Sequence, residues 1–459
     1  MTLRITSISE ALDEAAMGPV QWQIFIFAAL GIFIDGYDFF IIAAALPLIN
    51  MQWHPSAPVL GLIAASATVG AVAGGTFLGR YADVWGRRRL AILTMTLFAT
   101  LSFASAIAWG VASLIVIRFL LGAAIGADYP TGASYVVEFM PLATRRRLLF
   151  ASLSFQALGA VAGALLGLLF LRQHSFDAWR YILGFGMIPA VLILILRRSL
   201  PESPRWLCSK GRLDEAREVL ARIFGQPVEL DWVPDAPEPH VPVSALFRPE
   251  YLKKTIVACV PWFCMDVSLY GMALFTPIIL ATTAFASGST DFWVSDIKAL
   301  QGALFLDLFL VVGFAAGIYA IARLGILRAQ TIGFAGMTIG LLLVMFANHI
   351  GSGSLIFAGF ALFYLLVNAG PNGTTYMVPA EIYPTPVRAT GSGLAASAGK
   401  VGASVGIFLI PVMRGTWGLN ATLGVVVVVT LIGLFVTLLM RTSLNSTPHV
   451  DERAVPHAA

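Results

Sequence analysis

The sequence predicts an all-α membrane protein of twelve transmembrane helices, arranged as two pseudo-symmetric six-helix bundles. Hydrophobic residues make up 58% of the 459 residues and charged residues only 12%, whereas soluble domains carry about 25% charged residues. About a dozen apolar stretches approach the roughly 20 residues that an α-helix needs to cross a bilayer. A polar segment rich in Pro, Glu, Asp and Arg divides these stretches into two sets of six.

Each predicted span is a long apolar run with polar residues at its ends. The first six runs cover 22–49, 58–79, 90–110, 113–137, 149–171 and 180–197, and the second six cover 255–281, 299–321, 329–348, 354–379, 390–412 and 418–440. The predicted domains are an N-terminal segment (1–20), an N-terminal bundle (21–198), a linker (199–253), a C-terminal bundle (254–441) and a tail (442–459).

Basic residues predict how the chain is oriented, because Lys and Arg concentrate on the cytoplasmic side of a membrane. They follow spans 2, 4, 8, 10 and 12 and recur in the linker, while the opposite connections hold few. We therefore expect a multi-pass protein of the cell (inner) membrane with both termini cytoplasmic. Glu10, Asp13 and Glu14 precede the first apolar run, which argues against a signal peptide. Ser7 to Glu10 has the pattern of a capping box opening a short helix, with a disordered tail as the alternative.

Several function classes are disfavoured by composition. Three cysteines cannot form a disulfide framework, and the net charge of +4 is too small for a nucleic-acid partner. No metal-ligand cluster or nucleophile–base motif is apparent, so we expect no enzyme, no metal and no cofactor besides a coupling proton. The expected partners are a small-molecule substrate, protons and the lipid bilayer, with the chain working as a monomer.

An internal repeat relates the two halves. Glu138, Pro141 and Arg145 follow span 4 in the same spacing in which Glu381, Pro384 and Arg388 follow span 10. Arg197 and Ser199 after span 6 match Arg441 and Ser443 after span 12. Duplicated six-helix halves usually form their substrate site at the interface between them, near the middle of the bilayer.

Two motifs resemble those of a known family. Gly79 to Arg89 (GRYADVWGRRR) resembles the loop 2–3 motif of the major facilitator superfamily, and Pro201 to Leu207 (PESPRWL) resembles the motif that follows span 6 in sugar porters and related metabolite–proton symporters. Charged pairs at these helix ends can form in one conformation and break in another. The residues expected to act in gating are Gly79, Asp83, Gly86, Arg87, Glu138, Arg145, Glu381 and Arg388; the alternative is that the arginines only set topology.

Polar residues lie inside the predicted spans, where ionisable groups are costly and often functional. Span 1 carries Asp35 and Asp38, which share one helix face because they are three residues apart. The acids in spans 1, 4 and 7 outnumber the internal bases, so at least one is expected to titrate or to meet a ligand; Asp307 in span 8 is a further candidate or a packing residue. The internal polar residues are Asp35, Asp38, Arg118, Asp128, Tyr129, Gln156, Trp262, Asp266, Tyr270, Asn368, Asn372 and Lys400.

Within the superfamily, these positions resemble phosphate–proton symporters in spans 1, 4, 7, 10 and 11. The resemblance implies substrate contacts at Tyr129, Gln156, Trp262, Asp266, Tyr270, Asn372 and Lys400. It implies proton coupling by Asp35 and Asp128, with Arg118 coupled to Asp128 and with Asp38 as a further member of the group. Residues 246–251 are instead more similar to bacterial organic-acid symporters.

The chemistry of the site residues favours a small oxyanion that still holds a proton. Lys400 offers a positive charge, and Asp266 can accept a hydrogen bond that dihydrogen phosphate can donate and sulfate cannot. We therefore expect a proton-coupled symporter that imports a small anion, with phosphate as the first candidate. A proton symporter for an organic acid or a sugar is the alternative, although span 7 lacks the paired glutamines typical of hexose carriers. A non-transporting sensor is disfavoured by the short linker and tail.

Overall fold

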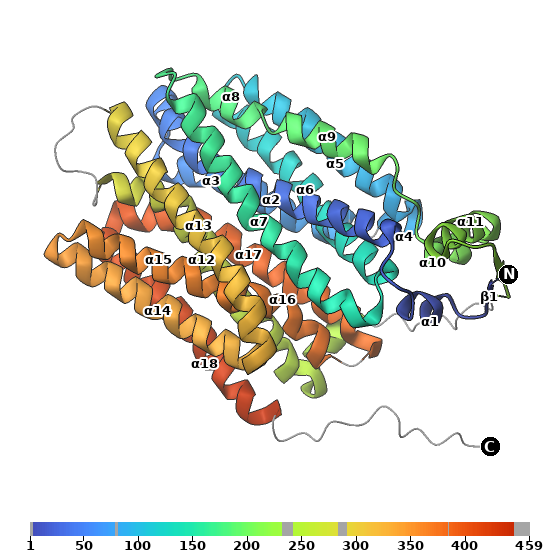
Figure 1. Cartoon of the computed structure of the whole chain (residues 1–459). Coiled ribbons are helices and arrows are strands. Elements are labelled where there is room, and N and C mark those ends of the chain that lie inside the picture. The colour runs from blue at the N-terminus through green and yellow to red at the C-terminus, as the bar shows by residue number, and fades with distance from the viewer. Residues whose placement is uncertain (1–2, 79–80, 232–241, 283–291, 384, 445–459) are drawn as a thin grey trace.

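The computed structural model describes residues 3–78, 81–231, 242–282, 292–383 and 385–444. Within these ranges the protein is almost entirely helical, with two short strands. Twelve of the described helical segments are long and apolar enough to cross a membrane, which confirms the predicted fold class. Figure 1 shows the N-terminal six spans, coloured blue to green, lying beside the C-terminal six, coloured yellow to red.

The N-terminal bundle contains α2 (Pro19–Trp53), α3 (Ala57–Ala73), α5 (Arg87–Ala106), α6 (Val111–Phe139) and α7 (Leu142–Leu171). Its sixth span consists of α8 (Ala178–Gly184) and α9 (Met187–Arg197). The second span ends in a π-helical turn, η1 (Gly74–Leu78), and the short α4 (Tyr81–Trp85) follows.

The C-terminal bundle contains α12 (Pro249–Thr282), α13 (Phe292–Leu324), α14 (Ile326–Ile350), α17 (Thr385–Trp417) and α18 (Leu419–Leu444). Its fourth span breaks at Gly370 into α15 (Gly353–Ala369) and α16 (Pro371–Ile382). The break lies next to Pro371, which cannot donate a backbone hydrogen bond. Several helices begin earlier than the apolar runs suggest, because polar first turns extend beyond the membrane.

Small residues let the spans approach closely. An added Cβ at Gly402 or Gly406 on α17 would collide with backbone carbonyls of α12, and α12 and α17 share the most extensive helix contact in the molecule. Gly70 and Gly74 pack in the same way against α6. This is the packing role expected of small residues at four-residue spacing in membrane helices.

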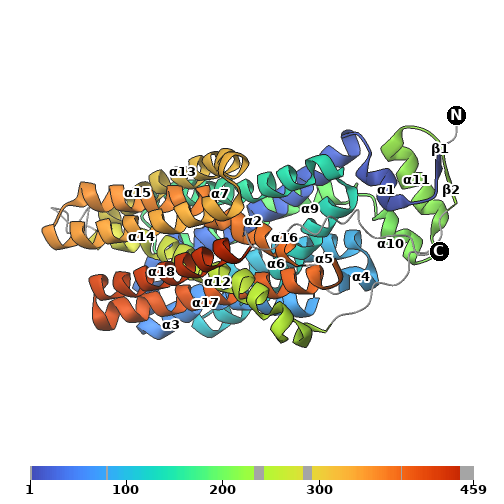
Figure 2. The same ribbon diagram turned by 90° about the horizontal axis from the view of Figure 1, so that it is seen from below.

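A small unit at one end of the molecule joins the N-terminal segment to the linker. Strand β1 (Leu3–Ile5) pairs in parallel with β2 (Val228–Leu230), and α1 (Ile8–Asp13), α10 (Pro204–Ser209) and α11 (Leu213–Phe224) pack around the pair (Figure 2). Ser7 accepts a hydrogen bond from the Glu10 amide at 3.3 Å, so the predicted helix start is confirmed. The strand pair was not predicted. We call this unit, residues 3–14 with 203–231, the end cap.

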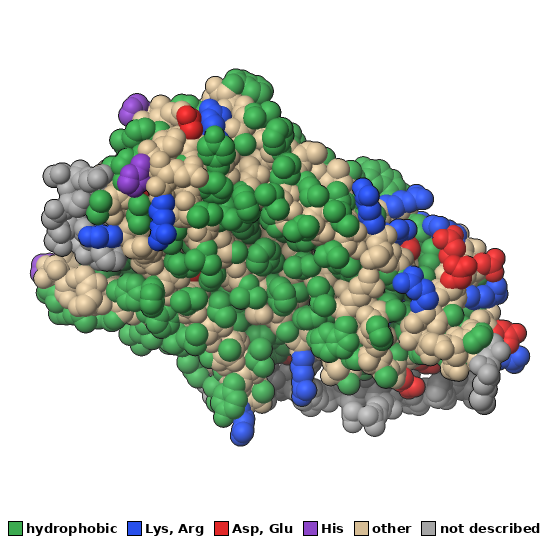
Figure 3. Space-filling model, turned by 45° about the horizontal axis from the view of Figure 1, so that its top comes forward, with side chains coloured by type: hydrophobic (Ala, Val, Ile, Leu, Met, Phe, Trp, Pro, Cys, Tyr) green, Lys and Arg blue, Asp and Glu red, His purple; other side chains and the backbone are tan. Residues whose placement is uncertain are grey.

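Charge is distributed unevenly along the molecule. Figure 3 shows a broad hydrophobic surface over the helices and a concentration of Lys, Arg, Asp and Glu at the end cap. Below, the linker end is the end of the bundles that carries the end cap, and the far end is the opposite one.

Candidate functional site

A cavity of about 110 Å³ lies between the two bundles near mid-span. Asp35 and Tyr129 line it from the N-terminal bundle, and Trp262 and Lys400 line it from the C-terminal bundle. Its remaining lining includes Gly75 of η1 and Gly393 of α17, so the cavity, which we call the chamber, extends toward the linker end. The chamber therefore lies at the inter-bundle position predicted for the substrate.

Lys400 occupies a cage of aromatic rings at the chamber wall. Its Nζ atom lies 5.0 Å from the ring centre of Phe39, 5.4 Å from that of Tyr129 and 5.6 Å from that of Tyr270. The negative ring faces attract an ammonium group. Within the described part of the chain, no carboxylate lies within salt-bridge distance of Lys400, so its charge remains available to a ligand.

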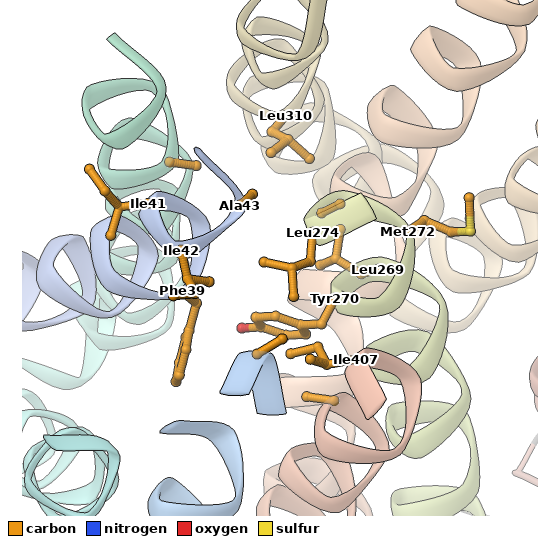
Figure 4. Packing of buried hydrophobic residues seen from close by; sticks show 14 of the residues in the cluster. Phe39, Ile41, Ile42, Ala43, Leu269, Tyr270, Met272, Leu274, Leu310 and Ile407 are labelled. Carbon is orange, nitrogen blue, oxygen red and sulfur yellow. The ribbon is translucent and has the colours of Figure 1, made fainter. Parts of the chain in front are cut away.

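Aromatic contacts between the bundles support this cage. The rings of Phe39 and Tyr270 meet edge to face at 5.8 Å, and Figure 4 shows Tyr270 on α12 pointing toward Phe39 on α2, with Leu269 and Leu274 beside it. Gln156 of α7 donates a hydrogen bond to the Tyr270 hydroxyl at 2.6 Å. Tyr270 is thus held by both bundles.

Asp266 lies one helical turn before Tyr270 and is buried, with 4% of its surface exposed. It accepts a hydrogen bond from Trp262, and Lys400 is the cation that acts on it. Gly399 makes this approach possible, because a Cβ at that position would overlap the Trp262 ring and lie 2.8 Å from Asp266 Oδ2. The predicted face of α12 therefore points at α17 and Lys400.

Asparagines of the fourth C-terminal span extend the polar region. Asn372 donates to Asn368 Oδ1 at 2.6 Å, and Asn368 donates to the Leu310 carbonyl at 3.1 Å. Both asparagines line a water-sized cavity of about 10 Å³ together with Gln156. Of the seven residues predicted to contact substrate, Tyr129, Trp262 and Lys400 line the chamber. Asp266, Tyr270 and Gln156 contact these residues or each other, and Asn372 lines the separate small cavity.

Sequence reasoning missed Tyr376. Its ring packs against Tyr129 at 6.1 Å and against Trp262 at 5.9 Å, so it connects the two bundles at the chamber wall. The signal was present in the sequence, because Tyr376 follows Asn368 and Asn372 at the same four-residue spacing.

Arg118 pairs with Asp38 and not with Asp128. Arg118 Nη1 lies 2.6 Å from Asp38 Oδ1, and both side chains are almost completely buried. The predicted coupling of Arg118 to Asp128 is wrong as a direct contact. The two residues are ten positions apart on α6, which separates them by about 15 Å along the helix axis.

Asp128 instead binds Arg197, the last residue of α9. The Arg197 guanidinium reaches the two carboxylate oxygens at 2.5 and 2.7 Å, and the Thr94 hydroxyl donates to the same carboxylate at 2.7 Å. Arg197 is 3% exposed. In the sequence it looked like a topology-setting residue at a helix end, so its role as an internal partner was missed.

Asp35 differs from the other two acids of the N-terminal bundle. It is 3% exposed and lines the chamber, and no hydrogen bond or salt bridge joins it to another described residue. Lys400 is the cation with the strongest electrostatic effect on it. Among the three acids, Asp35 is therefore the one that lines the chamber without an arginine partner.

The bundles close on each other at the far end. A Cβ at Gly61 of α3 would lie 2.9 Å from the Phe408 carbonyl of α17. The rings of His174, which follows α7, and Trp293 of α13 stack at 5.3 Å. These contacts bring the two bundles together at the far end.

Several predicted gating residues meet at the linker end. Arg87 forms a salt bridge of 3.0 Å with Glu138, and Arg145 pairs with Asp13 of the end cap. Gly79 and the side chain of Asp83 lie outside the described residues. Arg388 donates to the Tyr383 carbonyl at 3.2 Å, and Glu381 is exposed.

Glu202 was not predicted as part of this network. Its carboxylate accepts hydrogen bonds from the backbone amides of Arg87 and Arg88 at 2.9 and 3.2 Å, and so caps the N-terminus of α5. Gly86, with φ of 97°, leaves no space for a Cβ beside this carboxylate. Burial raises the pKa of Glu202, although hydrogen bonds from three backbone amides oppose the shift.

Comparisons with known proteins agree with this architecture. A family model described as sugar (and other) transporter matches residues 24–449. The inner membrane metabolite transport protein YgcS of Escherichia coli is 31% identical over 91% of this chain and 90% of its own. The putative inorganic phosphate transporter 1-13 of rice is 28% identical over 87% and 85%.

Solved structures with the same fold include the xylose transporter XylE of Escherichia coli in a partially occluded inward-open conformation. It superposes with a TM-score of 0.74 and 20% identity, covering 92% of this chain and 99% of that one.

Proposed function

This chain belongs to the sugar (and other) transporter family, and we propose that it is a proton-coupled symporter that imports a small anion, inorganic phosphate first, by alternating access. The observation that carries the proposal is Lys400, a partly buried cation with no carboxylate of the described residues within salt-bridge distance, caged by Phe39, Tyr129 and Tyr270 at the chamber. Even partial burial makes a charge without an ionic partner costly. An anionic substrate would supply the missing partner.

Asp266 adds selectivity to this attraction. An anion that bridges Lys400 and Asp266 must itself donate a hydrogen bond to the carboxylate, which a monoprotonated or diprotonated phosphate can do. A fully deprotonated anion would leave Asp266 unsatisfied beside a second negative charge. Inorganic phosphate transporters of plants and metabolite transporters of bacteria are comparably similar to this chain, so a protonated organic acid is the second candidate.

The proposed proton coupling rests on a difference among the three acids of the N-terminal bundle, namely whether each has an arginine partner. Asp38 and Asp128 have arginine partners in this conformation, and Asp35 has none. We assign the transported proton to Asp35 and a conformational role to the two buried pairs. The positively charged residues at the linker end support a cytoplasmic location for that end. With this orientation, the contacts between the bundles at the far end support an inward-facing conformation.

The decisive experiment is uptake of labelled phosphate into proteoliposomes with and without an inward proton gradient. Wild-type protein should accumulate phosphate only with the gradient, and sulfate should compete poorly. The Asp35→Asn variant should lose gradient-driven accumulation and retain counterflow exchange. If wild type accumulates xylose and ignores millimolar phosphate, the anion assignment is wrong.

A further inference from the structure

Asp307 is a buried acid that the central site does not use. It lies near the middle of α13, a membrane-spanning helix, and 7% of its surface is exposed. An ionisable residue at this depth is costly, and such residues usually mark an ion or proton pathway. The groups around Asp307 determine whether its charged or its neutral form is more stable.

No described cation acts on Asp307, and its carboxyl forms no salt bridge or hydrogen bond with another described residue. Its neighbour on α15 is Tyr364, on whose phenol Asp307 acts electrostatically. The Thr276 hydroxyl donates to the Met272 carbonyl at 2.7 Å and lies 2.8 Å from the Tyr364 hydroxyl. With the Thr276 proton on the Met272 carbonyl, Tyr364 is the donor in its hydrogen bond with Thr276.

With Tyr364 donating to Thr276, the Tyr364 oxygen can still accept a hydrogen bond but has no second proton to donate. A deprotonated Asp307 would therefore find no donor at Tyr364, whereas a protonated Asp307 could donate to it. A buried carboxylate without a cation or donor bears the full desolvation cost of its charge. Burial without a described cation or donor therefore favours the protonated form of Asp307.

A polar row joins this acid to the central site. Tyr364, Asn368, Asn372 and Tyr376 follow one another at four-residue spacing along α15 and α16. The Leu310 carbonyl, one turn after Asp307, accepts from Asn368. Asn372 and Gln156 share the water-sized cavity beside Tyr270, so polar groups extend from Asp307 to the chamber.

Other titratable groups on the neighbouring helices are committed elsewhere. Asp266 and Tyr270 of α12 bind Trp262 and Gln156, and Tyr376 of α16 packs at the chamber. α7 and α14 also pack against α13, and their described charged residues lie at their ends. These residues are Arg145, Arg147, Arg172, Arg328 and His349.

We propose that Asp307 is a second proton-binding site, located in the C-terminal bundle, and that it carries one proton per transport cycle in addition to the proton on Asp35. Two protons then accompany each anion. The polar row of α15 and α16 connects the two sites. This inference rests on the proposed proton symport, and its test separates the two claims.

The first test measures the number of protons transported with each phosphate. Proteoliposomes take up labelled phosphate while the membrane potential is clamped at zero. At a gradient of one pH unit, two coupled protons sustain about 100-fold accumulation and one proton about tenfold. Wild type should reach the higher limit and Asp307→Asn the lower one. Equal limits for the two proteins would overturn the second site, and no gradient dependence in wild type would overturn the symport itself.

A matched control lies on the same helix. Asp296 is also buried in α13, at 8% exposure, but it lies one turn from the far end and outside the polar row. Asp296→Asn should keep the wild-type accumulation limit. A fall in the limit equal to that of Asp307→Asn would overturn the assignment to Asp307.

A second measurement needs no substrate. Infrared spectra of the purified protein in lipid at neutral pH should contain a carbonyl-stretch band of a protonated carboxyl that Asp307→Asn removes. Tyr364→Phe should shift this band, because it removes the phenol that interacts electrostatically with the acid. Spectra of wild type and Asp307→Asn without any difference in this region would overturn the proposal, even if the variant folds and transports poorly.

Discussion

At the scale of single residues, the charged side chains inside the bundles fall into two groups: those that form salt bridges and those that do not. Asp38 and Asp128 each have a buried arginine, while Lys400 and Asp35 face the chamber without such a bond. The pairs stabilise the closed packing, and the unpaired groups are available for a ligand and a proton. Mutation of an unpaired group should therefore impair binding or coupling, whereas mutation of one member of a salt bridge should lower stability.

Replacing Lys400 should strongly weaken ligand binding while the fold persists. We expect Lys400→Ala to weaken phosphate binding by about 100-fold, within the range for truncating one partner of a buried charge pair. Binding to purified protein measures this effect. Lys298→Ala, which removes an exposed lysine of α13, is the control; equal weakening in both variants would contradict a specific role for Lys400.

Breaking the Asp38–Arg118 pair should lower stability. Arg118→Met leaves a buried carboxylate alone, at a cost of about 3–5 kcal/mol, and should lower the melting temperature in detergent. The double variant Arg118→Met, Asp38→Leu should recover most of the loss, because both charges are then removed. Arg217→Met, at an exposed salt bridge, should change little. A double variant as unstable as the single one would refute this account.

At the scale of elements, helix ends are secured by residues distant in sequence. Glu202 of the linker caps α5, and β2 of the linker pairs with β1. Local sequence reasoning recognised both motifs, GRYADVWGRRR and PESPRWL, but could not show that they bind each other. A cap supplied from over 100 positions away leaves no local pattern.

The raised pKa of Glu202 predicts a pH dependence of stability. The folded state holds the Glu202 proton more tightly than the unfolded state does, because burial disfavours the carboxylate. Its contribution is therefore fully present below the ordinary value of 4.5 and is lost as the pH rises through the higher folded pKa.

Melting curves between acid and neutral pH test this prediction. The melting temperature of wild type relative to Glu202→Gln should fall by about 1–2 °C as the pH rises. A difference that grows with pH would show that the amide hydrogen bonds outweigh burial.

At the scale of the whole molecule, the twelve spans could be predicted from runs of apolar residues. The central interface could be predicted from the polar residues inside those spans. The predicted bounds of the spans differ from the observed ones by up to seven residues. Of the seven predicted substrate residues, Tyr129, Trp262 and Lys400 line the chamber. The sequence could not predict which arginine each buried aspartate binds. Asp128 could have met either Arg118 or Arg197, and only helix packing decides between them. The strand pair was missed because three-residue strands carry too little pattern.

The conformational cycle can be tested at the far end. The far end closes where Gly61 meets α17, so Gly61→Trp should hold it open. Phosphate uptake should fall at least about tenfold, with binding retained, because one half of the cycle becomes inaccessible.

Gly110→Trp is the matched control, since a Cβ there meets open space. Wild-type uptake by Gly61→Trp would show that this contact is not part of the closure.

The parallel pairing of β1 with β2 also constrains biosynthesis. Residues 3–5 leave the ribosome first, but their partner at 228–230 follows only after six spans have been made. At about 5–20 residues per second the strand waits roughly 11–45 s. Ile5, Ile8 and Leu12, which are buried in the finished protein, are exposed during that interval. Docking of this segment therefore marks the moment at which the first half of the chain is complete.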